Sequence, residues 1–317
     1  MKSPGWHPGS TKPTAWAVLC CLLLSASYSA PSITPFEESV NRALAGQQAA
    51  AVVVRVRDRR VLAAYNPPVL RQRVASPGSA IKPFVLELML ETGTVRPEDS
   101  ISCKRGLVVA GRKLDCAHSP EFTTFRAEEA LALSCNSYFV TAAEQLKPGE
   151  LERRFRELGF TEPTGLLPGE GQGRIVPASS LEARQLLAIG IAGIEVTPLE
   201  LASAYLQLAR LDPSTASPAQ KVVLAGLRAA TDYGLAQNAK AGVLSVAGKT
   251  GTAGDPSDPH THAWFAGFTP AGFMPAGSPS PGKPEIVVVV FVEHGHGSVE
   301  AANLARSIFE AYQKNRP

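Results

Sequence analysis

The sequence lacks several features that would each place a chain in a large class of proteins. It has no internal repeat, which argues against a solenoid. It has no block of like charge: 31 basic and 28 acidic residues are spread along 317 positions, leaving a net charge of +3, so no nucleic-acid surface is indicated. It also lacks Cys-x-x-Cys or Cys/His zinc spacing and the spacing of a phosphate-binding loop. Neither a metal nor a cofactor is therefore predicted.

A hydrophobic run long enough to span a bilayer comfortably is missing too. The apolar segment Ala15–Leu24 falls short of the ~20 residues that a membrane helix needs, follows two lysines and precedes small residues up to Ala30. This order is typical of a secretory signal. We expect residues 1–30 to be a signal peptide, or a short membrane anchor if uncleaved. Residues 31–317 would then be the folded domain, in the periplasm or another extracytoplasmic space.

Cysteines are few. Two of the five, Cys20 and Cys21, lie in the leader. Cys103 and Cys116 flank a segment that reads as two short strands, where opposed positions could form a disulfide in an oxidising compartment. Two free buried thiols are the equal alternative. Cys135 is left over in either case.

Periodicity places strands at both ends of the mature chain and helices between them. A capping pattern at residues 34–37 opens a helix to about residue 45, and a hairpin follows over 49–56 and 61–65. Further helices are expected over residues 81–90, 127–133, 137–146, 150–158, 181–188, 198–211 and 299–312. Two of them are supported by capping boxes, at Ser179 and Thr197. Further strands are expected over residues 243–253, 262–269 and 285–293. The pattern predicts an α+β fold: an antiparallel sheet built from both chain ends, flanked by the terminal helices, with a mainly helical second lobe and a cleft between them.

Two Ser-x-x-Lys pairs occur, Ser79/Lys82 and Ser280/Lys283. The first opens a predicted helix, where residues three apart are neighbours and the helix N-terminus stabilises negative charge on a serine oxygen. Lys82 could take the serine proton if a partly dry site lowers its pKa. Pro83 cannot donate to the carbonyl of Ser79, a local conflict of the kind found at functional sites. The second pair lies in a Pro/Gly-rich stretch that would not hold both side chains on one face.

Ser-x-Asn also occurs twice. Ser39/Asn41 falls within a predicted helix and is read as solvated surface. Ser134/Asn136 falls between two predicted helices, where a short polar turn can point side chains into a cleft.

The segment Lys249–Thr252 lies in a strand pattern and contains Lys-Thr-Gly. Its glycine permits close approach of another backbone or a ligand. Its strand edge could pair with an extended peptide, and its lysine and threonines could bind a carboxylate.

Together and in this order, the three motifs resemble those of penicillin-binding proteins and serine β-lactamases. The segments PGSAIKPF, LSCNSYF, VTPLELASAY, GKTGTA and HAWFAGFTP are similar to the transpeptidase domain of class B penicillin-binding proteins, over about residues 49–312. The resemblance implies the serine β-lactamase/DD-peptidase fold. It also implies an enzyme, a peptidoglycan D,D-transpeptidase that acts on D-Ala-D-Ala stem peptides and binds β-lactams covalently.

The resemblance also implies a role for each motif residue. Ser79 would be the nucleophile and Lys82 its base, and Ser134 would relay a proton to the leaving D-alanine with Lys249 close by. The implied substrate-binding residues are Asn136, Thr250, Gly251 and Thr252. Backbone N–H groups of Ser79 and Thr252 would form the oxyanion hole.

Other functions stay open. A D,D-carboxypeptidase would use water as the acceptor, and a class D-type β-lactamase shares the motif order but carries an apolar residue where Asn136 stands. A penicillin sensor would need a transmembrane relay and a cytoplasmic domain, which we do not find. Since only Pro31–Gln48 separate the leader from the first strand, we expect the N-terminal domain of larger family members to be missing.

Two histidine pairs, His260/His262 and His294/His296, could each share a strand face. Polar residues are ordinary at strand ends, however, and so short a pattern is weak support for a site. We therefore predict no metal at either pair.

Overall fold

The structure is a computed structural model that describes residues 1–3, 5, 9, 33–212, 214–254, 260–269 and 283–317. The chain divides into two units, Met1–Ile33 and Thr34–Pro317, and the elements given below belong to the second. Most of the predicted leader, with Cys20 and Cys21, lies outside the described residues, as does Ser280. Among the helices that are described, we find none with the length and apolar character needed to cross a membrane.

A five-stranded antiparallel sheet forms the centre of the second unit, in the order β2-β1-β11-β10-β9. The register aligns Ala49 of β1 and Ala263 of β10 with Val292 of β11. Strands from both chain ends build this sheet, as predicted, and β9 lies at its edge. The strands are β1 (Ala49–Arg55), β2 (Val61–Tyr65), β9 (Ala247–Gly254), β10 (Thr261–Thr269) and β11 (Ile286–Val292).

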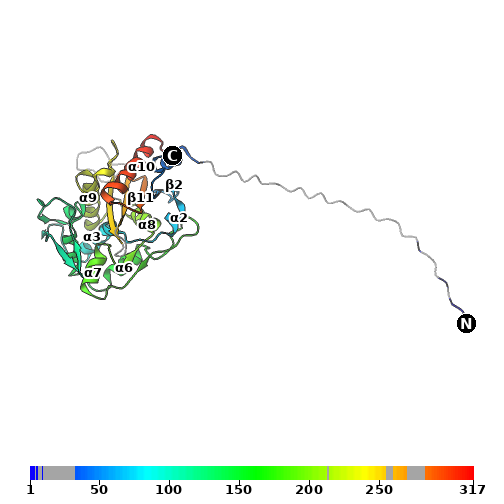
Figure 1. Ribbon diagram of the computed structural model, residues 1–317, viewed down its shortest axis with the longest axis horizontal. Coiled ribbons are helices and arrows are strands. Elements are labelled where there is room, and N and C mark those ends of the chain that lie inside the picture. Colours follow the sequence, from blue (N-terminus) through cyan, green and yellow to red (C-terminus); the bar gives the residue numbers. More distant parts are fainter. Residues whose placement is uncertain (4, 6–8, 10–32, 213, 255–259, 270–282) are drawn as a thin grey trace. The chain divides into compact units, whose positions relative to one another are not determined.

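Alternate residues of the central strands face opposite sides of the sheet, and both sides are buried. Val53 belongs to an apolar cluster with α1 (Pro35–Leu44) and α10 (Ala302–Lys314), whereas its neighbour Val52 belongs to a second cluster with the helical part of the chain. Because both faces of β11 are covered, its sequence IVVVVFV is a continuous apolar run. In Figure 1, α10 lies at the top of the view in red, and α6 and α7 lie at the bottom.

The middle of the chain is mainly helical, as predicted. Its α-helices are α2 (Pro67–Gln72), α3 (Lys82–Glu91), α4 (Ala127–Ala132), α5 (Asn136–Ala143), α6 (Glu150–Glu157), α7 (Leu181–Ala188), α8 (Pro198–Ala209) and α9 (Pro218–Asp232). The shorter elements of the unit are η1 (Gly78–Ile81), η2 (Gln237–Ala239), η3 (Gly297–Ala301), β3 (Ile101–Ser102), β4 (Leu107–Val109), β5 (Arg112–Leu114), β6 (Thr124–Phe125), β7 (Arg174–Ile175) and β8 (Ile194–Glu195).

Side-chain caps explain several of the helix N-termini. The predicted capping box at Thr197 is confirmed. The one at Ser179 is wrong by one residue: Ser180 is the cap, and its hydroxyl accepts the N–H three residues on at 3.1 Å. Helix α9 was missed, although Ser217 opens it with a capping box of the same type.

The predicted hairpin between Cys103 and Cys116 is present as the β4–β5 pair. Its two turn residues, Ala110 and Gly111, have φ of 49° and 76°. Positive φ at both positions is what a tight type I′ hairpin turn requires. The chain therefore reverses direction at this turn, and the segment after β5 runs back alongside the segment before β4.

Candidate active site

The Ser-x-x-Lys motif opens a helix, as predicted, but through a 3-10 turn. Ser79 lies in η1, and Lys82 and Pro83 begin α3. The N–H of Lys82 donates to the carbonyl of Ser79, which is a bond of the i to i+3 type. Proline lacks the N–H that an α-helical bond to this carbonyl would need, so the tighter turn resolves the conflict in the sequence. The side chain of Ser79 stays partly exposed.

Three side chains from distant elements hold the backbone on either side of this serine. The Ser76 carbonyl accepts hydrogen bonds from His262 Nε2 at 2.7 Å and Trp264 Nε1 at 3.0 Å, both on β10. The Ala80 carbonyl accepts one from the Tyr205 hydroxyl of α8 at 2.8 Å. Since a buried carbonyl without a partner is costly, these bonds fix the turn. No local sequence pattern indicates these three roles.

Lys82 is fully buried, and its amine is surrounded by acceptors. Nζ donates to the carbonyl of Ser134 at 2.9 Å and to Asn136 Oδ1 at 2.7 Å, and it lies 3.3 Å from the Ser134 hydroxyl. It also lies 4.9 Å from the ring centre of Phe139. Burial lowers the pKa of Lys82 to about 8, against the opposing effect of two nearby cysteines. Because burial disfavours the ammonium form, a fraction of the neutral amine is available near neutral pH to accept a proton.

Ser134 follows α4 in a left-handed backbone conformation, with φ of 54°. Its N–H donates to the Leu131 carbonyl at 3.3 Å, and the N–H of Cys135 donates to the Ala130 carbonyl at 3.0 Å. These two bonds are those of a Schellman motif, where glycine is usual. The left-handed conformation costs other residues roughly 1–2 kcal/mol. Such strain is characteristic of functional sites, and here the turn directs Ser134 and Asn136 to the same cleft.

Replacing Ser134 by glycine is expected to leave the fold about 1 kcal/mol more stable than replacing it by alanine. Both variants lose the hydroxyl, but only alanine keeps the left-handed strain. Urea unfolding followed by circular dichroism measures the difference. Equal stability of the two variants would mean that the turn stores no strain at this position.

The Lys-Thr-Gly segment lies on β9, which packs beside η1. Lys249 and Thr250 are buried, and Lys249 Nζ donates to the Thr250 carbonyl at 3.1 Å. Burial, and after it the charge of Lys82, lowers the pKa of Lys249 well below its ordinary value. The Thr252 hydroxyl accepts the N–H of Gly297 at 2.9 Å, so its orientation is set by the chain that follows β11.

Two glycines allow β9 and the turn at Ser79 to approach each other. A Cβ added at Gly251 would lie 2.3 Å from the Pro77 oxygen, and one added at Gly78 would lie 2.6 Å from the Thr252 oxygen. Both distances are well inside van der Waals contact. The glycine of the Lys-Thr-Gly motif is therefore required by the packing of one motif against another.

Gly78→Ala is expected to destabilise the fold by about 1–3 kcal/mol more than Gly46→Ala does. Both glycines have positive φ, 53° and 77°, so both substitutions strain the backbone. A Cβ at Gly46 would meet nothing within 4 Å, so only Gly78→Ala adds a clash with β9. The midpoints of denaturant unfolding of the two variants measure this difference in stability, provided that the m value does not change. Equal losses would show that the close approach has no energetic weight.

A cleft of about 250 Å³ brings the motifs together. The predicted residues that line it are Ser79, Ser134, Asn136, Thr250 and Thr252. Lys82, Lys249 and Gly251 lie buried beside this lining. The lining residues that sequence analysis missed are Asp115, Ala117, Leu235, His296 and Ser298. An alcohol beside a buried amine, with a second alcohol in contact with that amine, is an arrangement suited to nucleophilic acyl transfer.

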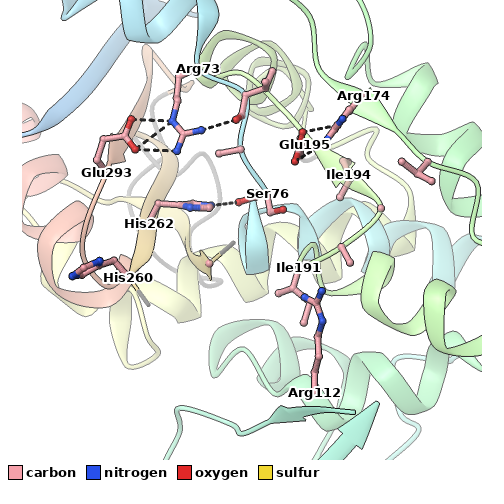
Figure 2. A pocket seen from close by; sticks show the side chains of 16 residues that line it. Arg73, Ser76, Arg112, Arg174, Ile191, Ile194, Glu195, His260, His262 and Glu293 are labelled. Atoms are coloured by element: carbon pink, nitrogen blue, oxygen red, sulfur yellow. Dashed lines mark hydrogen bonds and ion pairs between the residues drawn. The ribbon is translucent and has the colours of Figure 1, made fainter. Parts of the chain in front are cut away.

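A second pocket is lined by Ser76, three residues before Ser79, and by residues that include Arg73 and His262 (Figure 2). Two of its arginines are paired with carboxylates, Arg73 with Glu293 at 2.9 Å and Arg174 with Glu195 at 2.7 Å. His262 points toward the turn from β10. None of the residues predicted to be catalytic is among the described residues that line this pocket.

The three described cysteines lie together as free thiols. Cys103 Sγ lies 3.6 Å from Cys116 Sγ, which lies 3.9 Å from Cys135 Sγ, whereas a disulfide needs ~2.05 Å. Of the two alternatives that the sequence left open, the structure therefore has the free thiols and not the disulfide. His118 Nε2 joins the group, 3.6 Å from Cys103 Sγ. Sequence analysis missed this group because separate segments contribute its members.

Comparison with known proteins places the chain in a sequence family. The family model described as "Penicillin binding protein transpeptidase domain" matches residues 49–310. The chain is 26% identical over 307 residues to the peptidoglycan D,D-transpeptidase MrdA of Acinetobacter baumannii, covering 80% of this chain and 44% of that protein. It is 28% identical over 273 residues to the stage V sporulation protein D of Bacillus subtilis, covering 74% and 41%. It thus spans less than half the length of these relatives.

Solved structures show the same fold. A peptidoglycan glycosyltransferase from Burkholderia ambifaria matches with a TM-score of 0.72 and 24% identity, over 88% of this chain and 94% of that one. Penicillin-binding protein 2 from Helicobacter pylori matches with a TM-score of 0.75 and 19% identity, over 88% and 62%. The fold class predicted from the sequence is confirmed.

Proposed function

Because the chain belongs to the family of penicillin-binding protein transpeptidase domains, we propose that it is a peptidoglycan D,D-transpeptidase that works through an acyl-enzyme on Ser79. β-Lactams would acylate the same serine as substrate mimics. The observation that supports this most strongly is the single cleft in which Ser79, Ser134 and Asn136 meet, with the buried amine of Lys82 bonded to the last two.

In the proposed first step, Ser79 Oγ attacks the carbonyl between the two terminal D-alanines of a stem peptide. The neutral amine of Lys82 takes the serine proton, and Ser134, 3.3 Å from that amine, passes a proton to the departing nitrogen. A carbon–oxygen bond forms and the carbon–nitrogen bond to the last D-alanine breaks. The developing oxyanion would be held by backbone N–H groups of Ser79 and Thr252, since such donors contribute ~10²–10³ in rate.

In the second step, an amine of another stem peptide attacks the acyl-enzyme and a cross-link forms. Attack by water in its place would give a carboxypeptidase. A chain that hydrolysed the acyl-enzyme of a β-lactam rapidly would be a β-lactamase. All three outcomes begin with acylation of Ser79. The transpeptidase and the carboxypeptidase differ in the acceptor, and the β-lactamase differs from both in the acyl donor.

The edge position of β9 supports a substrate-binding role for the Lys-Thr-Gly segment. An extended peptide can pair with an edge strand, and Thr250 and Thr252 face the cleft from β9. We propose that the peptide's terminal carboxylate binds these two hydroxyls, with the amine of Lys249 close behind. Asn136, whose oxygen already accepts from Lys82, would hold a backbone amide of the peptide.

We propose further that residues 1–30 export this domain or anchor it, and that residues 31–317 work outside the cytoplasm. Peptidoglycan stem peptides are found there, so this placement agrees with the proposed substrate. Cleavage of the leader can be read from the N-terminal sequence of the protein recovered from the periplasm or the membrane fraction.

The test of the proposed function uses the intact protein with three substrates. A fluorescent penicillin should label it covalently, and the label should survive a denaturing gel. A stem peptide ending in D-Ala-D-Ala, supplied with an acceptor amine, should yield a cross-linked product in excess of the trimmed peptide. Trimmed peptide alone would identify a carboxypeptidase, and fast turnover of a chromogenic cephalosporin would identify a β-lactamase. Absence of any penicillin label would overturn the proposal.

A further inference from the structure

We propose that Cys103, Cys116, His118 and Cys135 form a Zn²⁺ site beside the cleft, and that the bound ion fixes the turn between α4 and α5. One ligand atom from each of these residues lies within 4.8 Å of every other. This site goes beyond the transpeptidase chemistry, which uses none of the four side chains.

Three of the six distances between the ligand atoms are close to those of a tetrahedral zinc site. With Zn–S of ~2.3 Å and Zn–N of ~2.0 Å, the edges of the tetrahedron are ~3.8 Å between sulfurs and ~3.5 Å between sulfur and nitrogen. The structure has 3.6 Å for Cys103–Cys116, 3.9 Å for Cys116–Cys135 and 3.6 Å for Cys103–His118. Three cysteines and one histidine are a common structural zinc set, and soft thiolates do not suit magnesium or calcium.

The surroundings of the cluster suit coordination by thiolates and a neutral imidazole. Cys116, His118 and Cys135 are buried, and Cys103 is partly exposed. His118 Nδ1 lies 3.0 Å from both the Ser119 carbonyl and Arg105 Nη2; in the tautomer that donates to the carbonyl, Nε2 keeps the lone pair that a metal needs.

Charge around the cluster also agrees. Three thiolates and one Zn²⁺ sum to one negative charge. Arg105 crosses the same segment and donates to the carbonyls of His118 and Ser119 at 2.9 and 2.7 Å. Its guanidinium therefore sets a positive charge beside a site that would be anionic when filled.

The cluster is connected to the cleft through one extended segment. Cys116 and His118 are buried with the cluster, while Asp115 and Ala117, which alternate with them, line the cleft. Side chains that alternate along an extended chain point to opposite sides. A metal held by the first pair therefore fixes the position of the second.

The metal would also hold the Ser-x-Asn turn directly, because Cys135 stands between Ser134 and Asn136. Asn136 Nδ2 donates to the Asp115 carbonyl at 3.0 Å, and its Oδ1 accepts from Lys82 at 2.7 Å. An ion joining Cys135 to the segment at Asp115 would thus fix both sides of this contact. We infer that it positions the Ser134 hydroxyl against the Lys82 amine.

Metal content tests the site itself. The full chain, purified without chelator, should carry one zinc ion per molecule, and Co²⁺ in its place should give the intense visible bands of tetrahedral thiolate coordination. Cys103→Ser and His118→Ala should each lower the zinc content at least about tenfold, whereas His294→Ala, the matched control for His118→Ala, should keep it. No bound zinc and no cobalt bands in the unmodified chain would overturn the proposal, as would a mass lower by the two hydrogens that a disulfide loses.

The positioning role rests on the proposed function and has a separate readout. Removal of zinc with a chelator should lower the rate constant of penicillin acylation at least about tenfold, more than it weakens penicillin binding, and added zinc should restore it. Zinc that is bound but can be removed with no change in this rate would overturn the positioning role. A chain that never reacts with penicillin would refute the proposed function, while its metal content would still decide the zinc site.

Discussion

Replacing Ser79 by alanine is expected to abolish covalent capture of a fluorescent penicillin. The acylation rate should fall by about 10⁶-fold, the loss that follows removal of the serine nucleophile in a serine hydrolase. The reason is geometric: Ser79 is a partly exposed hydroxyl in the cleft wall, whereas Ser134 is buried against the Lys82 amine. Fluorescence per mass of protein on a denaturing gel measures the effect.

The sequence offers a matched control for this substitution. Ser280 stands before Lys283 at the same spacing, and Ser280→Ala should keep the full label. If Ser79→Ala kept the label and Ser280→Ala lost it, the nucleophile would belong to the other Ser-x-x-Lys pair. Because the Ser79 side chain is not fully buried, its loss should leave the circular dichroism spectrum and the unfolding midpoint close to those of the unchanged protein.

Lys82→Met is expected to lower the acylation rate by about 10²–10⁴-fold, the usual contribution of a positioned general base. Methionine fills much of the same buried volume but cannot accept a proton. It also leaves the acceptors of Ser134 and Asn136 without their donor, which costs stability, so the fold is checked by circular dichroism. The surface substitution Lys147→Met should change the rate less than twofold, within the small effect expected of exposed sites. Unchanged acylation by Lys82→Met would exclude Lys82 as the base.

The pH dependence gives an independent check of the same role. In the proposed mechanism the neutral amine is the reactive form, and the pKa of Lys82 is lowered to about 8 by burial. Acylation by the intact enzyme should therefore rise about tenfold per pH unit well below this value and level off above it. Lys82→Met should lose this dependence. A rate that fell as the pH rose through 8 would mean that the ammonium form is required, contrary to the proposed mechanism.

The amino-acid sequence by itself predicted the strands of the central sheet, most of the longer helices and the motif residues, although it missed α9. Apolar runs such as that of β11 and caps such as Thr34 and Thr197 depend on residues a few positions apart, so they could be recognised locally. The arrangement of strand and helix patterns predicted the α+β fold, and the order of Ser79, Ser134 and Lys249 along the chain predicted the family. The site at Ser79 was predicted from this order before any distance was known.

Tertiary structure alone decided the properties that depend on neighbours distant in sequence. The lowered pKa of Lys82 follows from burial and not from the residue type. The left-handed turn at Ser134, a position where glycine is usual, could not be read from its short motif. The gathering of Cys103, Cys116, His118 and Cys135 requires segments on both sides of α4 to meet. Desolvation, strain and ligand geometry arise only once the chain has folded, because each depends on which atoms fill the space around a group.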